Sequence, residues 1–106
     1  MEIKIFDGHI KTSDAQRDYI TGKLQRIVDR LSNPATSAEV RLVDLNATKG
    51  GVDKQCSIVV VSSGRPPLRV EAQATDYYAA IDAASATLVR LVSKTLEREK
   101  VNGPRQ

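Results

Sequence analysis

The chain has 106 residues, of which 41% are hydrophobic, and this size and composition suit a single compact domain with one core. Sixteen Lys and Arg residues against thirteen Asp and Glu residues give a formal net charge of +3, a mild basic bias that is compatible with a nucleic-acid partner. The single cysteine, Cys56, excludes an internal disulfide framework, and the sequence contains neither a signal-peptide pattern nor an apolar membrane span, so we expect a cytoplasmic protein.

The first elements in the chain are a strand and an amphipathic helix. Residues 2–6, EIKIF, alternate apolar and charged side chains, which predicts a half-buried strand. Ser13 is followed three positions later by Gln16, the pattern of a capping box, so a helix should begin there. Apolar residues at spacings of three and four then predict one buried stripe, formed by Ile20, Leu24, Ile27, Val28 and Leu31.

Three further strands and a second helix follow. Residues 38–45 and 54–61 are rich in Val, Leu and Ile, and the Gly50-Gly51 pair between them predicts an antiparallel connection. Pro66 and Pro67 cannot donate ladder hydrogen bonds, so the next strand should cover residues 68–74. The last helix can be capped by Thr75 or Asp76, and its buried stripe comprises Tyr77, Ala80, Ile81, Ala84, Leu88, Leu91 and Val92.

The order β-α-β-β-β-α predicts an α+β fold. A parallel first pair of strands joined through a helix, followed by a meander, gives a four-stranded, mostly antiparallel sheet with two helices packed on one face. This is the general arrangement of double-stranded-RNA-binding-domain-like folds. We assign residues 1–100 to one such domain and residues 101–106 to a short flexible tail.

The sequence offers little that could support catalysis. His9 is the only histidine and Cys56 the only cysteine, and no glycine-rich phosphate loop is present. Asp7, Asp44 and Asp53 lie in or beside predicted turns, where aspartate ordinarily binds backbone N–H groups, and they lack the spacing of a calcium loop. We therefore expect no enzyme activity, no catalytic residue, no metal site, no cofactor and no small-molecule substrate.

Basic residues form a line on each predicted helix. Like charges at these spacings repel by about 0.2 to 0.5 kcal/mol per pair, and the helix macrodipole explains cations only in the last turn. A solvated charged face is one alternative, and a surface for the phosphates of folded RNA is the other. The predicted RNA-binding residues are Lys23, Arg26 and Arg30 on the first helix and Arg90, Lys94 and Arg98 on the second.

Two segments resemble a known family. The segment DYYAAIDAASATLVRLVSKTLEREK, residues 76–100, is similar to the signature helix of the ribosome hibernation promoting factors, which include the ribosome-associated inhibitor A proteins. The segment SDAQRDYITGKLQRI, residues 13–27, resembles their first helix, and LRVEAQA, residues 68–74, resembles the strand before the second. Thr87 and Leu96 occupy positions where many relatives carry basic residues, so the second basic line is thinner here.

The resemblance implies a ribosome-binding domain of the short family form. Its members bind small-subunit rRNA between head and body, overlap the mRNA and tRNA sites, and silence translation under stress. The resemblance implies that the partner is the small ribosomal subunit, with no membrane involved, and it leaves open whether ribosome dimers form through another factor. The loop at residues 46–55 and the turn at residues 62–70 resemble a branch labelled as modulators of an alternative sigma factor, so a protein-interaction regulator on the same scaffold is the alternative function.

Overall fold

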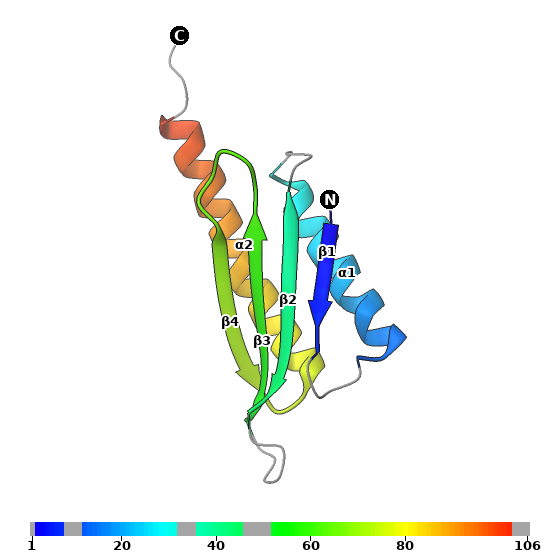
Figure 1. Ribbon diagram of the computed structural model, residues 1–106. Helices are drawn as coiled ribbons and strands as arrows, with labels where there is room; N and C mark the ends of the chain where they lie inside the picture. Colours follow the sequence, from blue (N-terminus) through cyan, green and yellow to red (C-terminus); the bar gives the residue numbers. More distant parts are fainter. Residues whose placement is uncertain (1, 8–11, 32–35, 46–51, 103–106) are drawn as a thin grey trace.

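The strand nearest the N-terminus lies beside a strand that follows the first helix. In the computed structural model, which describes residues 2–7, 12–31, 36–45 and 52–102, β1 (Glu2–Phe6) runs parallel to β2 (Ser37–Asp44), and α1 (Asp14–Asp29) lies between them in sequence. β3 (Lys54–Val61) and β4 (Leu68–Ala74) complete a mixed sheet with the order β1-β2-β3-β4. The predicted β-α-β-β-β-α fold with one parallel pair is confirmed (Figure 1).

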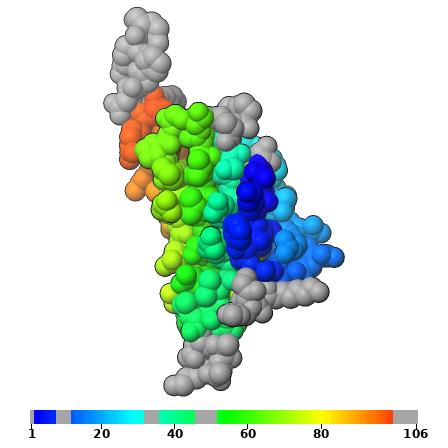
Figure 2. Space-filling model, in the orientation of Figure 1, coloured from blue at the N-terminus to red at the C-terminus, as the bar shows by residue number. Residues whose placement is uncertain are grey.

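Both helices lie on the same side of this sheet. α1 and α2 (Tyr77–Asn102) run behind the strands in Figure 1, and the opposite face is uncovered in Figure 2. The strand burial patterns agree, because inward-facing residues such as Val40 and Ile58 are buried while their sequence neighbours are exposed or half-buried. The core therefore forms a layer between the sheet and the two helices.

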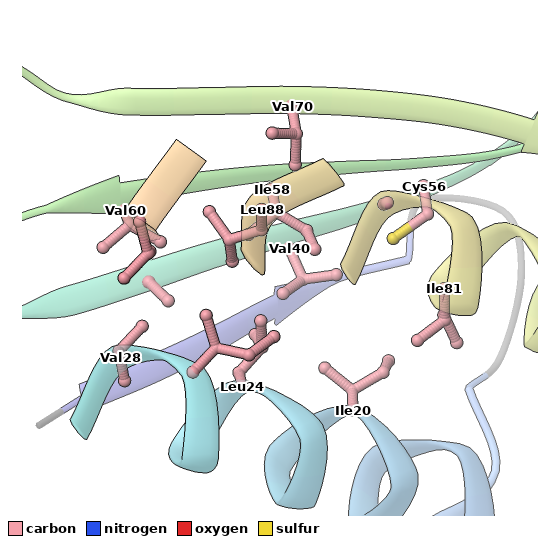
Figure 3. Packing of buried hydrophobic residues seen from close by; sticks show 14 of the residues in the cluster. Ile20, Leu24, Val28, Val40, Cys56, Ile58, Val60, Val70, Ile81 and Leu88 are labelled. Carbon is pink, nitrogen blue, oxygen red and sulfur yellow. The ribbon is translucent and has the colours of Figure 1, made fainter. Parts of the chain in front are cut away.

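The core is built from the apolar stripes that the sequence predicts. Ile20, Leu24 and Val28 of α1 point toward the sheet, and Leu88 of α2 packs among the strand residues (Figure 3). Cys56 is a fully buried member of this cluster. Because β-branched and leucine side chains fill the layer, the two helices are fixed against the sheet and their outer faces are left for solvent or a partner.

The helix starts agree with the sequence signals. The Ser13 hydroxyl accepts from the Gln16 N–H at 3.1 Å, and the Gln16 side chain accepts from the Ser13 N–H, so the predicted capping box is present. At α2, the Asp76 carboxylate accepts from the Ala79 N–H at 2.8 Å. Of the two predicted caps, Asp76 is therefore the one that is used.

The element ends differ little from the predicted ones. β2 begins and ends one residue earlier than predicted, and α2 continues to Asn102, so it includes the first two residues that the sequence assigned to the tail. The β3–β4 turn has Gly64 at a φ of 81°, a left-handed value that favours glycine. His9, the Gly50-Gly51 signal and residues 103–106 lie outside the described residues.

Candidate nucleic-acid interface

One edge of α1 faces α2 and carries the first basic line. Tyr19 and Lys23 both contact Asp82 of α2, so this edge lies at the junction of the two helices. Arg26 and Arg30 continue the edge at spacings of three and four and are exposed. The outer edge of α1 instead carries acidic residues, Asp14, Asp18 and Asp29, all exposed. The basic residues of α1 are thus concentrated on the side toward α2.

The junction itself is a cluster of two tyrosines, a lysine and an aspartate. The Tyr19 hydroxyl donates to Asp82 Oδ1, and the Lys23 ammonium lies 2.9 Å from the same oxygen. The Tyr19 and Tyr78 rings meet edge to face with centroids 5.0 Å apart, and the Lys23 ammonium lies 5.3 Å from the Tyr19 ring centre. This cluster joins α1 to α2 through residues that are 63 positions apart in the sequence.

The junction shifts the pKa of each of its three ionisable partners. The Tyr19 hydroxyl and then the Lys23 ammonium stabilise the carboxylate, so the pKa of Asp82 is lowered. The hydrogen bond to Asp82 raises the pKa of Lys23 and likewise raises the pKa of Tyr19. At neutral pH the cluster therefore contains a carboxylate, an ammonium and a neutral phenol, and its two charges compensate each other.

The second basic line lies on the exposed face of α2. Arg90, Lys94 and Arg98 are all exposed, while Leu88 and Val92 beside them are fully buried. One guanidinium nitrogen of Arg90 donates to the Thr87 hydroxyl at 3.2 Å, and that hydroxyl bonds the Ala83 carbonyl one turn earlier. Thr87, which the family resemblance marked as a lost basic position, thus holds the Arg90 side chain at the α2 surface.

Lys23 differs from the other five residues of the two basic lines in having a carboxylate partner. Within the part of the chain that the structure describes, no carboxylate forms an ion pair with Arg26, Arg30, Arg90, Lys94 or Arg98. Lys23 alone among the six predicted residues is paired, with Asp82. Five uncompensated cations therefore lie on the helical side of the molecule, which is an arrangement that can bind phosphates.

Arg65 stabilises the end of α2 that carries Arg98. Its guanidinium donates to both carboxylate oxygens of Glu99, to the Leu31 carbonyl at 3.3 Å and to the Ser62 hydroxyl at 3.0 Å. It thereby joins the end of α1, the β3–β4 turn and the last turns of α2, which extend past the sheet in Figure 1. Sequence patterns do not indicate this role, because Arg65 lies in a predicted turn far from Glu99 in the chain.

The three aspartates that the sequence places in or beside turns, Asp7, Asp44 and Asp53, have structural partners. The Asp7 carboxylate accepts from the Thr12 N–H at 2.9 Å, and the Lys54 ammonium lies 3.2 Å from Asp44 and 2.9 Å from Asp53. Among the described residues, no three His, Cys, Asp or Glu side chains gather in a way that could hold a metal ion. None of the described helices is long and apolar enough to cross a membrane.

Comparison with known proteins agrees with this architecture. The family model described as "Sigma 54 modulation protein / S30EA ribosomal protein" matches residues 3–100. The N-terminal domain of Protein Y from Thermus thermophilus is 31% identical, with a TM-score of 0.74 over 90% of this chain and 99% of that chain. A ribosomal subunit interface protein from Coxiella burnetii shares the fold, with 20% identity and a TM-score of 0.67 over 92% of this chain and 99% of that chain. No curated protein sequence matches the chain significantly.

Proposed function

The chain belongs to the sigma 54 modulation protein / S30EA ribosomal protein family, and from this membership we propose that it is a translation inhibitor that binds the ribosome. In this proposal a surface formed by Arg26, Arg30, Arg90, Lys94 and Arg98 binds rRNA of the small subunit, and the bound domain occludes the mRNA and tRNA sites under stress. The protein acts by reversible binding, without chemistry and without a cofactor, and it works in the cytoplasm with ribosomes. The observation that carries the proposal is the group of five uncompensated cations on the two helices.

The physical basis of this binding is the release of counterions from RNA phosphates. A protein cation that neutralises a phosphate displaces condensed salt ions, and this supplies affinity without reading the base sequence. The strands carry only one aromatic residue, Phe6, whose ring is engaged by Arg41 at 4.6 Å, so the sheet does not provide a platform on which bases could stack. The helices are therefore the better surface, and folded RNA is the better ligand.

Co-sedimentation with purified small ribosomal subunits tests the proposal. We expect saturable pelleting of about one copy per subunit, because one composite surface is involved. The variant Arg90→Glu/Lys94→Glu should lose most of this binding, since two contacts become repulsive. A matched control is Arg41→Glu/Arg69→Glu, which makes the same change in net charge on the uncovered sheet face.

Two outcomes would contradict the proposal. If the folded wild-type protein does not pellet with subunits at low or physiological salt, the ribosome is not its partner. If the sheet-face control loses as much binding as the helix variant, the association depends on total charge and not on the helical surface. Inhibition of translation in vitro by the wild-type protein, and not by the helix variant, is the expected functional counterpart.

The family description also supports a second candidate, because it includes modulation of a sigma factor. In that case the basic lines would face an acidic protein surface, and the chain would be a protein-interaction regulator. Complete RNA digestion separates the two functions, since a protein partner recovered from lysate should remain bound after nuclease treatment. A ribosomal association should then fall away. Ribosome dimers formed together with another factor would appear as heavier particles in the same sedimentation experiment.

A further inference from the structure

Asp82, which forms an ion pair with Lys23, places a negative charge next to the basic line of α1. The carboxylate side chain is 50% exposed and the Lys23 side chain 36% exposed, so the pair lies at the surface where a ligand would approach. An ion pair with this much solvent contact contributes little to folding stability. Its larger consequence is electrostatic, because it removes one cation from the line that begins with Lys23.

The geometry also holds Lys23 in place. Asp82 Oδ1 accepts from both the Lys23 ammonium, at 2.9 Å, and the Tyr19 hydroxyl, and the ammonium also lies 5.3 Å from the centre of the Tyr19 ring. For Lys23 to bind a phosphate, its ammonium would have to leave the carboxylate or bring the phosphate close to it. A phosphate there would meet the Asp82 charge at short range, and this repulsion opposes binding.

We propose that Asp82 is a positioning residue that joins α1 to α2 by binding Tyr19 and Lys23, and that it thereby keeps Lys23 out of phosphate binding. On α1, the RNA-binding surface then consists of Arg26 and Arg30 and does not include Lys23. This inference rests on the proposed function, and it restricts that function to five of the six cations that the sequence predicts. Asp82 limits the affinity for RNA in this arrangement.

The salt dependence of binding to small subunits distinguishes a side chain that contacts an RNA phosphate from one that is paired with a carboxylate of the protein. Each phosphate contact contributes about 0.7 to 0.9 to the slope of log affinity against log salt concentration. Lys23→Gln should leave the slope unchanged, whereas Arg26→Gln, the matched control on the same helix edge, should lower it by about that amount. Asp82→Asn keeps an acceptor for Tyr19 but releases Lys23, so the slope should rise by up to the same amount and the affinity several-fold.

A second measurement needs no RNA. Trace labelling of the free protein with acetic anhydride, followed by mass spectrometry, reports how reactive each lysine amine is. Lys23 should react more slowly than the exposed Lys94, and Asp82→Asn should abolish this difference because the amine loses its partner. Circular dichroism of each variant, compared with the wild type, verifies that the fold is unchanged.

The outcomes separate this inference from the proposed function. If Lys23→Gln lowers the slope as much as Arg26→Gln, or if Asp82→Asn changes neither slope nor labelling, the inference is overturned while ribosome binding stands. If the wild-type protein does not bind subunits, the proposed function falls. In that case equal labelling of Lys23 and Lys94 would also overturn the pairing, and slow labelling of Lys23 would support it.

Discussion

Removing the charges of Arg90 and Lys94 should weaken RNA binding in a way that depends strongly on salt. In Arg90→Gln/Lys94→Gln, two exposed cations of α2 become neutral, and neither forms an ion pair with a described carboxylate that the change would break. The two residues are four positions apart, so their mutual repulsion disappears. The free energy of unfolding should therefore stay the same or rise by about 0.2 to 0.5 kcal/mol.

The expected loss of affinity follows from the number of contacts removed. Two phosphate contacts account for about 1.4 to 1.8 of the slope of log affinity against log salt concentration. At about 0.1 M monovalent salt this corresponds to a loss of roughly 25- to 60-fold, and at about 0.5 M to a loss of only roughly 3-fold. The difference between wild type and variant should thus shrink as salt increases.

Fluorescence anisotropy of labelled protein with purified small subunits measures this, in a potassium chloride series from about 0.05 to about 0.5 M at constant magnesium. The variant Arg90→Lys/Lys94→Arg preserves both charges and should keep the wild-type slope, although the Thr87 contact of Arg90 is lost. Parallel lines for wild type and the neutral variant would refute the reasoning. They would mean that the two side chains act through packing or hydrogen bonding and not through phosphate neutralisation.

Three further predictions concern stability and reactivity. Burial raises the pKa of the Cys56 thiol to about 12, so the native protein should not react with Ellman's reagent at pH 8 except through unfolding; fast reaction without denaturant would contradict this. A hydrogen bond from Arg65 lowers the pKa of Glu99, and one from Tyr19 lowers the pKa of Asp82, below the values in the unfolded chain. The stability that these two carboxylates contribute is therefore present above about pH 4.5 and is lost as the pH falls through their folded pKa values, and a urea midpoint at pH 3 equal to that at pH 7 would contradict this. Arg65→Met removes the hydrogen-bond donor of Glu99, the Ser62 hydroxyl and the Leu31 carbonyl, so the free energy of unfolding measured in urea should fall by about 1 to 3 kcal/mol. A change within experimental error would show that these hydrogen bonds add nothing to stability.

The secondary structure was largely predictable because its signals are local. β3 and β4 have the predicted bounds, since alternation and the Pro66-Pro67 pair act within a few residues. The capping box at Ser13 needs only residues three positions apart, and the helix stripes follow from a period of 3.6. Once the order of helices and strands was known, the helix between the first two strands indicated a parallel pair and the short turns after them indicated a meander. Few other sheet topologies were possible.

Which cations of the candidate site are paired with carboxylates was not predictable in the same way. Lys23 looks like a free cation in the sequence, because its partner Asp82 is far away along the chain and meets it only when α1 packs against α2. The same holds for Arg65, whose partner Glu99 lies 34 positions later. The spacing of charges on one helix indicates which residues share a face, and the packing between elements decides which of them are compensated.

The separation of charges within the molecule is compatible with the proposed phosphate-binding surface even though the net charge is only +3. On the uncovered sheet face, exposed acidic and basic residues are equal in number and interleaved: Glu2, Lys4, Glu39, Arg41, Arg69 and Glu71. On the helical side the charges are separated rather than in excess: the anions Asp14, Asp18 and Asp29 lie on the outer edge of α1, and the cations Arg26 and Arg30 lie on its edge toward α2. Arg90, Lys94 and Arg98 follow one another at spacings of four on α2. Like charges along one helix reduce its intrinsic stability slightly, by about 0.2 to 0.5 kcal/mol per pair, and the buried core beneath α2 is large enough to offset this. A polyanion is the kind of ligand that would relieve that repulsion, because each phosphate bound between neighbouring cations turns a destabilising spacing into a favourable one.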